Sequence, residues 1–152
     1  MITSTTLIYI LAGVLGTIGF SILFRLKPLH WLYAGIVGFF TCVAYFIGLE
    51  IFDGVLAPNI LGAFVCALSS EFFARIGKAP ATVFLLPGII TLVPGRTLYY
   101  TMSELMNNNY IEAGHNLLLT VEVAVALGGG IIGASILRII IFNTYDRIKK
   151  RK

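Results

Sequence analysis

Five long apolar runs limit what this 152-residue chain can fold into. They cover residues 5–24, 31–49, 55–74, 79–102 and 116–142, and each has about the ~20 residues with which an α-helix crosses a hydrocarbon core of ~30 Å. Only 12% of the residues are charged, about half the share of a soluble domain. The sequence therefore predicts an all-α integral membrane protein, one transmembrane domain (1–152) built as a bundle of five helices.

The Lys and Arg residues predict how the bundle is oriented. Arg25 and Lys27 follow the first run, Arg75 and Lys78 follow the third, and the chain ends in a basic tail, 143–152. The second and fourth connections contain acids but neither Lys nor Arg. Basic connections favour the cytoplasmic side, so we expect the N-terminus outside and the C-terminus in the cytoplasm. We expect the tail to contact anionic lipid headgroups rather than nucleic acid.

The fourth run contains two Pro-Gly pairs, Pro87–Gly88 and Pro94–Gly95. Proline removes a backbone donor and glycine lowers the cost of irregular backbone. Unpaired backbone groups must be buried in protein or line a wet cavity, and many transporters build their sites from such discontinuous helices. A kinked structural helix is the alternative. The break predicts a substrate site formed by Pro87, Gly88, Thr91, Pro94, Gly95, Arg96 and Tyr99.

Arg96 has two interpretations at this stage. Its guanidinium matches a substrate carboxylate in bidentate geometry, but it could equally extend to the outer interface or pair with Glu104. No motif for a catalytic triad, a metal or a nucleotide is present, and Cys42 and Cys66 lie inside apolar runs. We therefore expect neither enzymatic activity nor a cofactor.

Two acids are candidates for proton coupling. Glu122 lies well inside the fifth run and shares a helix face with Ala126, Gly129 and Gly133. Small residues mark close helix contacts, and buried acids often belong to proton pathways, although a protonated structural glutamic acid is the alternative. Glu71 could serve the same pathway, or it could simply stabilise its helix by pairing with Arg75.

The fourth run resembles the small membrane component of the threonine/serine exporter family. The residues that carry the resemblance are Pro80, Pro87, Leu92, Val93, Pro94, Gly95, Tyr99 and Met102. Thr91 and Arg96 depart from the family pattern, which leaves the exact substrate open.

The resemblance implies export of small polar metabolites, either threonine/serine-type amino acids or dicarboxylates. It implies the bacterial cytoplasmic (inner) membrane, a proton gradient as the driving force, and a larger exporter-family membrane subunit as partner. A homo-oligomer is a further possibility. The alternative function is a non-transporting membrane scaffold or assembly subunit.

Overall fold

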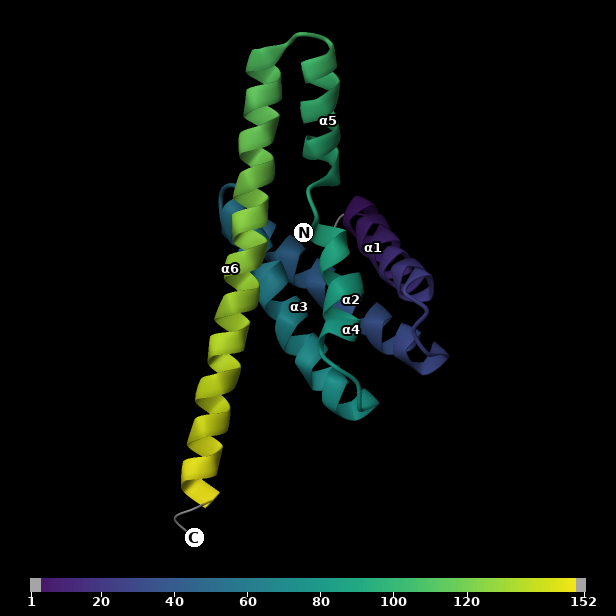
Figure 1. The fold of residues 1–152 in the computed structure, drawn as a ribbon, viewed down its shortest axis with the longest axis vertical. Coiled ribbons are helices and arrows are strands. Elements are labelled where there is room, and N and C mark those ends of the chain that lie inside the picture. The colour runs from purple at the N-terminus through teal and green to yellow at the C-terminus, as the bar shows by residue number, and fades with distance from the viewer. Residues whose placement is uncertain (1–3, 150–152) are drawn as a thin grey trace.

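The computed structural model of the chain describes residues 4–149, which form helices and short connections (Figure 1). The elements are α1 (Ser4–Leu23), α2 (Pro28–Ile51), α3 (Leu56–Gly77), α4 (Thr82–Ile89), the 3-10 helix η1 (Ile90–Leu92), α5 (Gly95–Met106) and α6 (Tyr110–Lys149). Four of these helices are long and apolar enough to cross a membrane, and the bent pair of α4–η1 with α5 makes a fifth if it is one span. The predicted all-α membrane bundle is confirmed.

The helix ends follow local sequence signals. Pro28 begins α2, where its missing N–H costs no helical hydrogen bond. Lys78 ends α3 in the left-handed conformation, with φ of 48°. The predicted basic tail, 143–152, begins inside α6, and its residues 150–152 lie outside the described part of the chain.

Only the second Pro-Gly pair breaks the fourth segment. Pro87 and Gly88 lie within α4 and are buried, so the expectation that both pairs interrupt the helix is wrong. Pro87 is close to the end of a short helix and costs it a single backbone hydrogen bond. Val93, by contrast, is extended because the residue before a proline disfavours the α conformation. The chain bends by 53° between η1 and α5.

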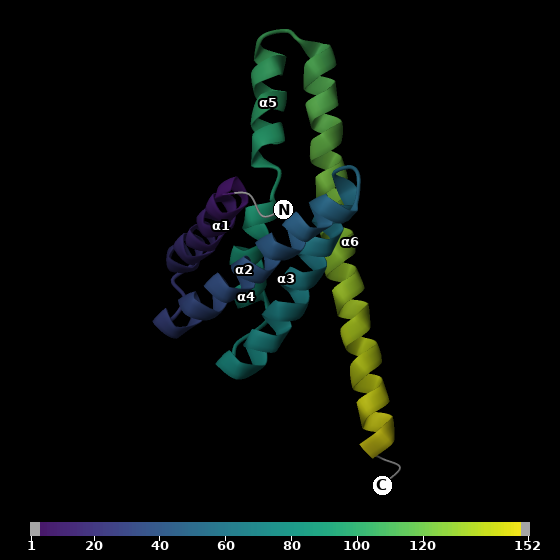
Figure 2. The ribbon, with the colours of Figure 1, turned by 180° about the vertical axis from the view of Figure 1, so that it is seen from behind.

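The helices form a bundle from which one hairpin projects. α3 packs between α2 and α6, α4 packs against α2 and α3, and α1 lies mainly on α2. α5 pairs with the N-terminal part of α6, and this hairpin extends beyond the other helices at one end (Figures 1 and 2). The α1–α2 and α3–α4 connections lie toward the end opposite the hairpin tip (Figure 1).

Candidate functional site

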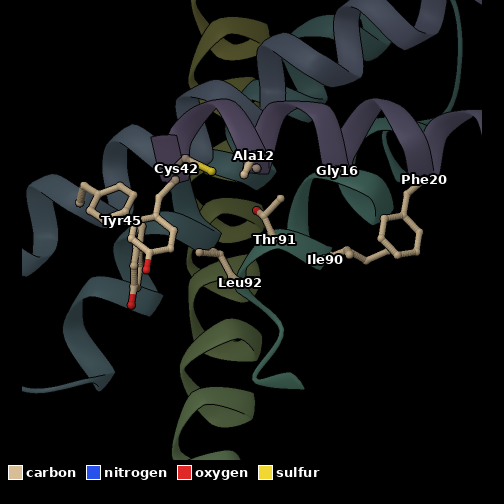
Figure 3. A pocket seen from close by; sticks show the side chains of 11 residues that line it. Ala12, Gly16, Phe20, Cys42, Tyr45, Ile90, Thr91 and Leu92 are labelled. Carbon is tan, nitrogen blue, oxygen red and sulfur yellow. The ribbon is translucent and has the colours of Figure 1, made fainter. Parts of the chain in front are cut away.

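A cavity of about 400 Å³ lies between α1, α2 and η1 (Figure 3). Small residues of α1 form one wall, and η1 forms another through Ile90, Thr91 and Leu92. The polar side chains at its surface are Tyr9, Cys42, Tyr45 and Thr91. The cavity therefore adjoins the break in the fourth segment, where the sequence predicts a site.

Glycines of α1 make room for this cavity. Gly13 lies so close to α2 that an added Cβ would be 2.5 Å from Cys42 Sγ. One turn further along, Gly16 has nothing within 4 Å of the position of an added Cβ. α1 is thus in close contact with α2 at one glycine and leaves open space at the next.

The cavity has the size of a small-molecule site and a neutral lining. Ligand sites commonly occupy about 300–1,000 Å³. Among the described residues, the lining side chains are apolar or carry a hydroxyl or thiol, and none is charged. Thr91 Oγ1 donates to the Gly88 carbonyl at 2.9 Å, which ties its side chain to the last turn of α4. Hydroxyl groups can donate to or accept from a small polar solute.

Of the seven predicted substrate-binding residues, only Thr91 lines this cavity. Pro87 and Gly88 face the other helices, because a Cβ on Gly88 would lie 2.8 Å from Val37 Cγ1 and 2.9 Å from Cys66 Sγ. Their role in the structure is the close packing of α4 against α2 and α3.

The other four predicted residues lie beyond the bend. Pro94 directly precedes α5, Gly95 is its first residue, and Arg96 and Tyr99 are exposed on its first turns. The Arg96 guanidinium carbon lies 5.6 Å from the ring centroid of Tyr100, a cation–π contact within its own helix. The described structure therefore does not bring the seven residues into one site.

The α5–α6 hairpin buries hydroxyl groups between its two helices and exposes large apolar side chains on α5. Thr101 is 3% exposed, and Thr120 of α6 donates to Thr97 of α5 at 2.8 Å. On the outward face of α5, Tyr99 is 69% and Met102 61% exposed. Such a surface fits contact with lipid or another apolar surface rather than with water.

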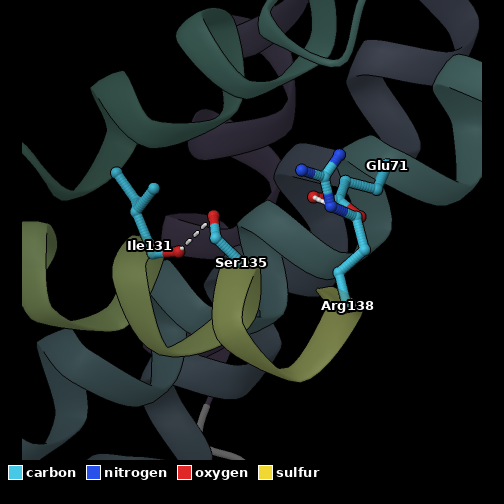
Figure 4. A network of polar contacts seen from close by, with 4 residues as sticks. All are labelled: Glu71, Ile131, Ser135 and Arg138. Atoms are coloured by element: carbon cyan, nitrogen blue, oxygen red, sulfur yellow. Dashed lines mark hydrogen bonds and ion pairs between the residues drawn. The ribbon is translucent and has the colours of Figure 1, made fainter. Parts of the chain in front are cut away.

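The two acids lie away from the cavity. Glu71 Oε1 is 3.3 Å from Arg138 Nε, an ion pair between α3 and α6 (Figure 4). Glu122 is half-buried on α6, and no hydrogen bond or ion pair of its carboxylate is found within the described part of the chain. Within that part, no group of three or more His, Cys, Asp or Glu is placed to hold a metal ion.

The predicted face around Glu122 is partly wrong. Ala126 is buried, and a Cβ on Gly133 would lie 3.6 Å from Phe64 of α3, both as expected. Gly129, however, is exposed, with no atom within 4 Å of an added Cβ. The contact of α6 with α3 is centred one position further along, on Val123, Leu127 and Gly130.

Sequence reasoning also missed Tyr9, Gly13, Cys42 and Tyr45 as cavity residues. They belong to α1 and α2, which have no proline inside the helix and no charged residue among the cavity-lining positions to mark a site. The glycines of α1 were the only signal in the sequence, and they equally fit ordinary helix packing.

A membrane bundle with a discontinuous segment beside a cavity of small-molecule size is typical of secondary transporters. The family model of the threonine/serine exporter, ThrE, matches residues 9–137. Because this match covers most of the chain, the protein belongs to the threonine/serine exporter family, which is a family of transporters rather than enzymes. No curated protein and no solved structure matches the chain.

Proposed function

We propose that this chain is the small subunit of a secondary transporter that exports threonine, serine or similarly small polar metabolites. The observation that carries the proposal is the cavity of about 400 Å³ at the break in the fourth segment. Its hydroxyl groups suit a hydroxy amino acid, because Thr91, Tyr9 and Tyr45 can exchange hydrogen bonds with a substrate hydroxyl or carboxylate. Small dicarboxylates are the second substrate class.

Arg96 and Tyr99 take a different role in this proposal from that of the cavity residues. Both are exposed on α5, beyond the bend. Arg96 would bind a substrate carboxylate on its way into or out of the cavity, since its guanidinium offers a bidentate contact. Pro87, Gly88, Pro94 and Gly95 would act on the substrate only through the shape of the backbone.

In this proposal, Glu122 and Glu71 couple export to the proton gradient. Within the described part of the chain, the Glu122 carboxyl group on α6 has no hydrogen-bond or ion-pair partner, and a residue that takes up and releases a proton needs such freedom. Protonation of Glu71 would break its ion pair with Arg138 and so loosen α6 from α3.

A larger exporter-family subunit would complete the transporter in the bacterial cytoplasmic membrane. Two features support a partner of this kind. Large apolar side chains such as Tyr99 and Met102 are exposed on the α5–α6 hairpin, and α1 covers the cavity from one side with few of its residues buried. A second copy of this chain is the alternative partner.

The experiment that tests the function is a comparison of two α1 glycine variants. Gly16 lines the cavity, whereas Gly19 does not, and neither has an atom within 4 Å of an added Cβ. Gly16→Leu should fill the cavity and reduce threonine or serine efflux by about tenfold or more, a loss of at least ~1.4 kcal/mol. Gly19→Leu should leave efflux close to that of the wild type.

Efflux would be followed by mass spectrometry of the medium from cells that express the chain with its larger subunit. Equal efflux from both variants, with equal amounts of protein in the membrane, would contradict the cavity as the substrate site. If no small polar metabolite depended on the chain at all, the scaffold function would be favoured.

A further inference from the structure

A second cavity, of about 200 Å³, lies where the end of α3, the α3–α4 connection and α6 meet. It is lined by Glu71, Ala74, Arg75, Ala79, Ala81 and Arg138. The substrate cavity described above shares none of these residues, so the two cavities are separate.

The charges at this second cavity do not cancel. Glu71 forms its ion pair with Arg138 through Nε of the guanidinium (Figure 4), which carries further N–H donors on its two terminal nitrogens. Arg75, one turn after Glu71 on α3, adds a second guanidinium. Two arginines and one glutamate leave a net charge of +1. Arg138 is 48% exposed, so a ligand can reach it.

The N-terminus of α4 also favours a negatively charged ligand in this cavity. Ala81, which lines the cavity, is the residue directly before α4, so the positive end of the α4 dipole lies beside it. The N–H groups of residues 83–85 donate to the carbonyls of Pro80 and Ala81, so the helix contributes through its dipole rather than through these donors. The α1–α2 connection with Arg25 and Lys27 lies toward the same end of the bundle (Figure 1). Basic residues of the α1–α2 connection, of α3 and of α6 thus lie toward this end of the bundle.

We propose that this cavity binds a phosphate group, held by Arg138 and Arg75, with Glu71 orienting Arg138. Arginine is suited to phosphate because its planar guanidinium donates two parallel hydrogen bonds. The phosphate belongs either to an anionic lipid headgroup or to a soluble molecule. The proposal does not depend on the transport function, because it concerns binding at a separate cavity.

Two probes distinguish the sources, both used on the full chain in a maltoside detergent, which contains no phosphate. The first is phosphatidylglycerol, counted on the protein by native mass spectrometry. The second is inorganic phosphate, titrated by calorimetry. The variants are Arg138→Gln and Arg75→Gln, with Lys27→Gln as matched control, since Lys27 is exposed at the same end but does not line the cavity.

We expect the wild type and Lys27→Gln to bind one of the probes, and the two arginine variants to bind it about tenfold more weakly, the effect of losing one charged hydrogen bond. Phosphatidylglycerol binding would identify a lipid site, and inorganic phosphate binding a soluble ligand. If the wild type binds neither probe, or if Lys27→Gln loses as much affinity as Arg138→Gln, the proposal is wrong.

If Arg138→Gln does not fold, Arg138→Lys tests the phosphate site in its place, because it keeps the positive charge beside Glu71. A lysine cannot donate two parallel hydrogen bonds, so phosphate binding should weaken several-fold while the chain stays folded. Unchanged binding in Arg138→Lys and in Arg75→Gln would overturn the phosphate site.

Discussion

Glu122 lies in a membrane-spanning helix, where an ionisable side chain is energetically costly. It is half-buried on α6, directly before Val123, which belongs to the apolar contact with α3. Ionisable side chains in membrane segments are costly and face a bundle interior or a wet cavity. A carboxyl group there can accept a proton on one side of the membrane and release it on the other, which a glutamine of the same shape cannot do.

Glu122→Gln should therefore uncouple export from the proton gradient. We expect threonine efflux to fall about tenfold, within the range of couplings of about 1–3 kcal/mol, and to lose its dependence on external pH. The measurement is efflux from mildly acidic to neutral medium. The control is Glu112→Gln, an exposed acid in the first turn of the same helix. If Glu122→Gln followed external pH as the wild type does, Glu122 would have no part in coupling.

At the level of the helices, the contact of α3 with α6 depends on Gly130, the last of three consecutive glycines in α6. A Cβ on Gly130 would lie 2.6 Å from the Ile60 carbonyl oxygen and 2.7 Å from Ala63 Cβ. Gly128 and Gly129 have nothing within 4 Å of the same position. Backbone atoms cannot move aside as a flexible side chain can, so the two helices approach this closely only where Gly130 allows it.

Gly130→Ala should lower the free energy of unfolding by about 1–3 kcal/mol, the usual cost of overpacking. Gly128→Ala and Gly129→Ala should instead be neutral or stabilising by up to ~1 kcal/mol, since alanine is the better helix former. Denaturant unfolding of the three variants in detergent, followed by circular dichroism, measures the difference. Equal stabilities would show that α6 does not meet α3 through Gly130.

The helical elements could be predicted from the sequence, whereas the site could be predicted only in part. A long apolar run by itself predicts a membrane-spanning helix, so the helical bundle could be predicted from the composition and length of the runs. Prolines mark the candidate places for a bend but not which of them bends: Pro87 is accommodated within α4, whereas Pro94 keeps Val93 extended and so makes the bend. Which side of α6 meets α3 differs by one residue from expectation, because the small residues Gly128, Gly129 and Gly130 are equivalent in the sequence.

At the scale of the whole molecule, α6 is longer than a membrane requires. Its 40 residues extend about 60 Å, twice the ~30 Å of a hydrocarbon core. Even at a tilt of about 40°, the upper end of the observed range, only about 39 Å would lie in the core. About 20 Å of α6 therefore lies outside the core, divided between the hairpin end and the basic C-terminal end, and apolar side chains of α5 that reach beyond the core call for a covering surface such as the proposed larger subunit.

The distribution of basic residues between the two ends of the bundle predicts which connections can be reached from outside the cell. The α1–α2 connection and the α5–α6 connection lie at opposite ends (Figures 1 and 2), and only the first contains basic residues. With Cys42 and Cys66 replaced by alanine, Asn107→Cys should react in intact cells with a maleimide that does not cross membranes. Lys27→Cys should react only after permeabilisation, because basic connections are retained in the cytoplasm. The reverse pattern would place the hairpin tip in the cytoplasm, and the export direction of the proposed transporter would have to be reconsidered with it.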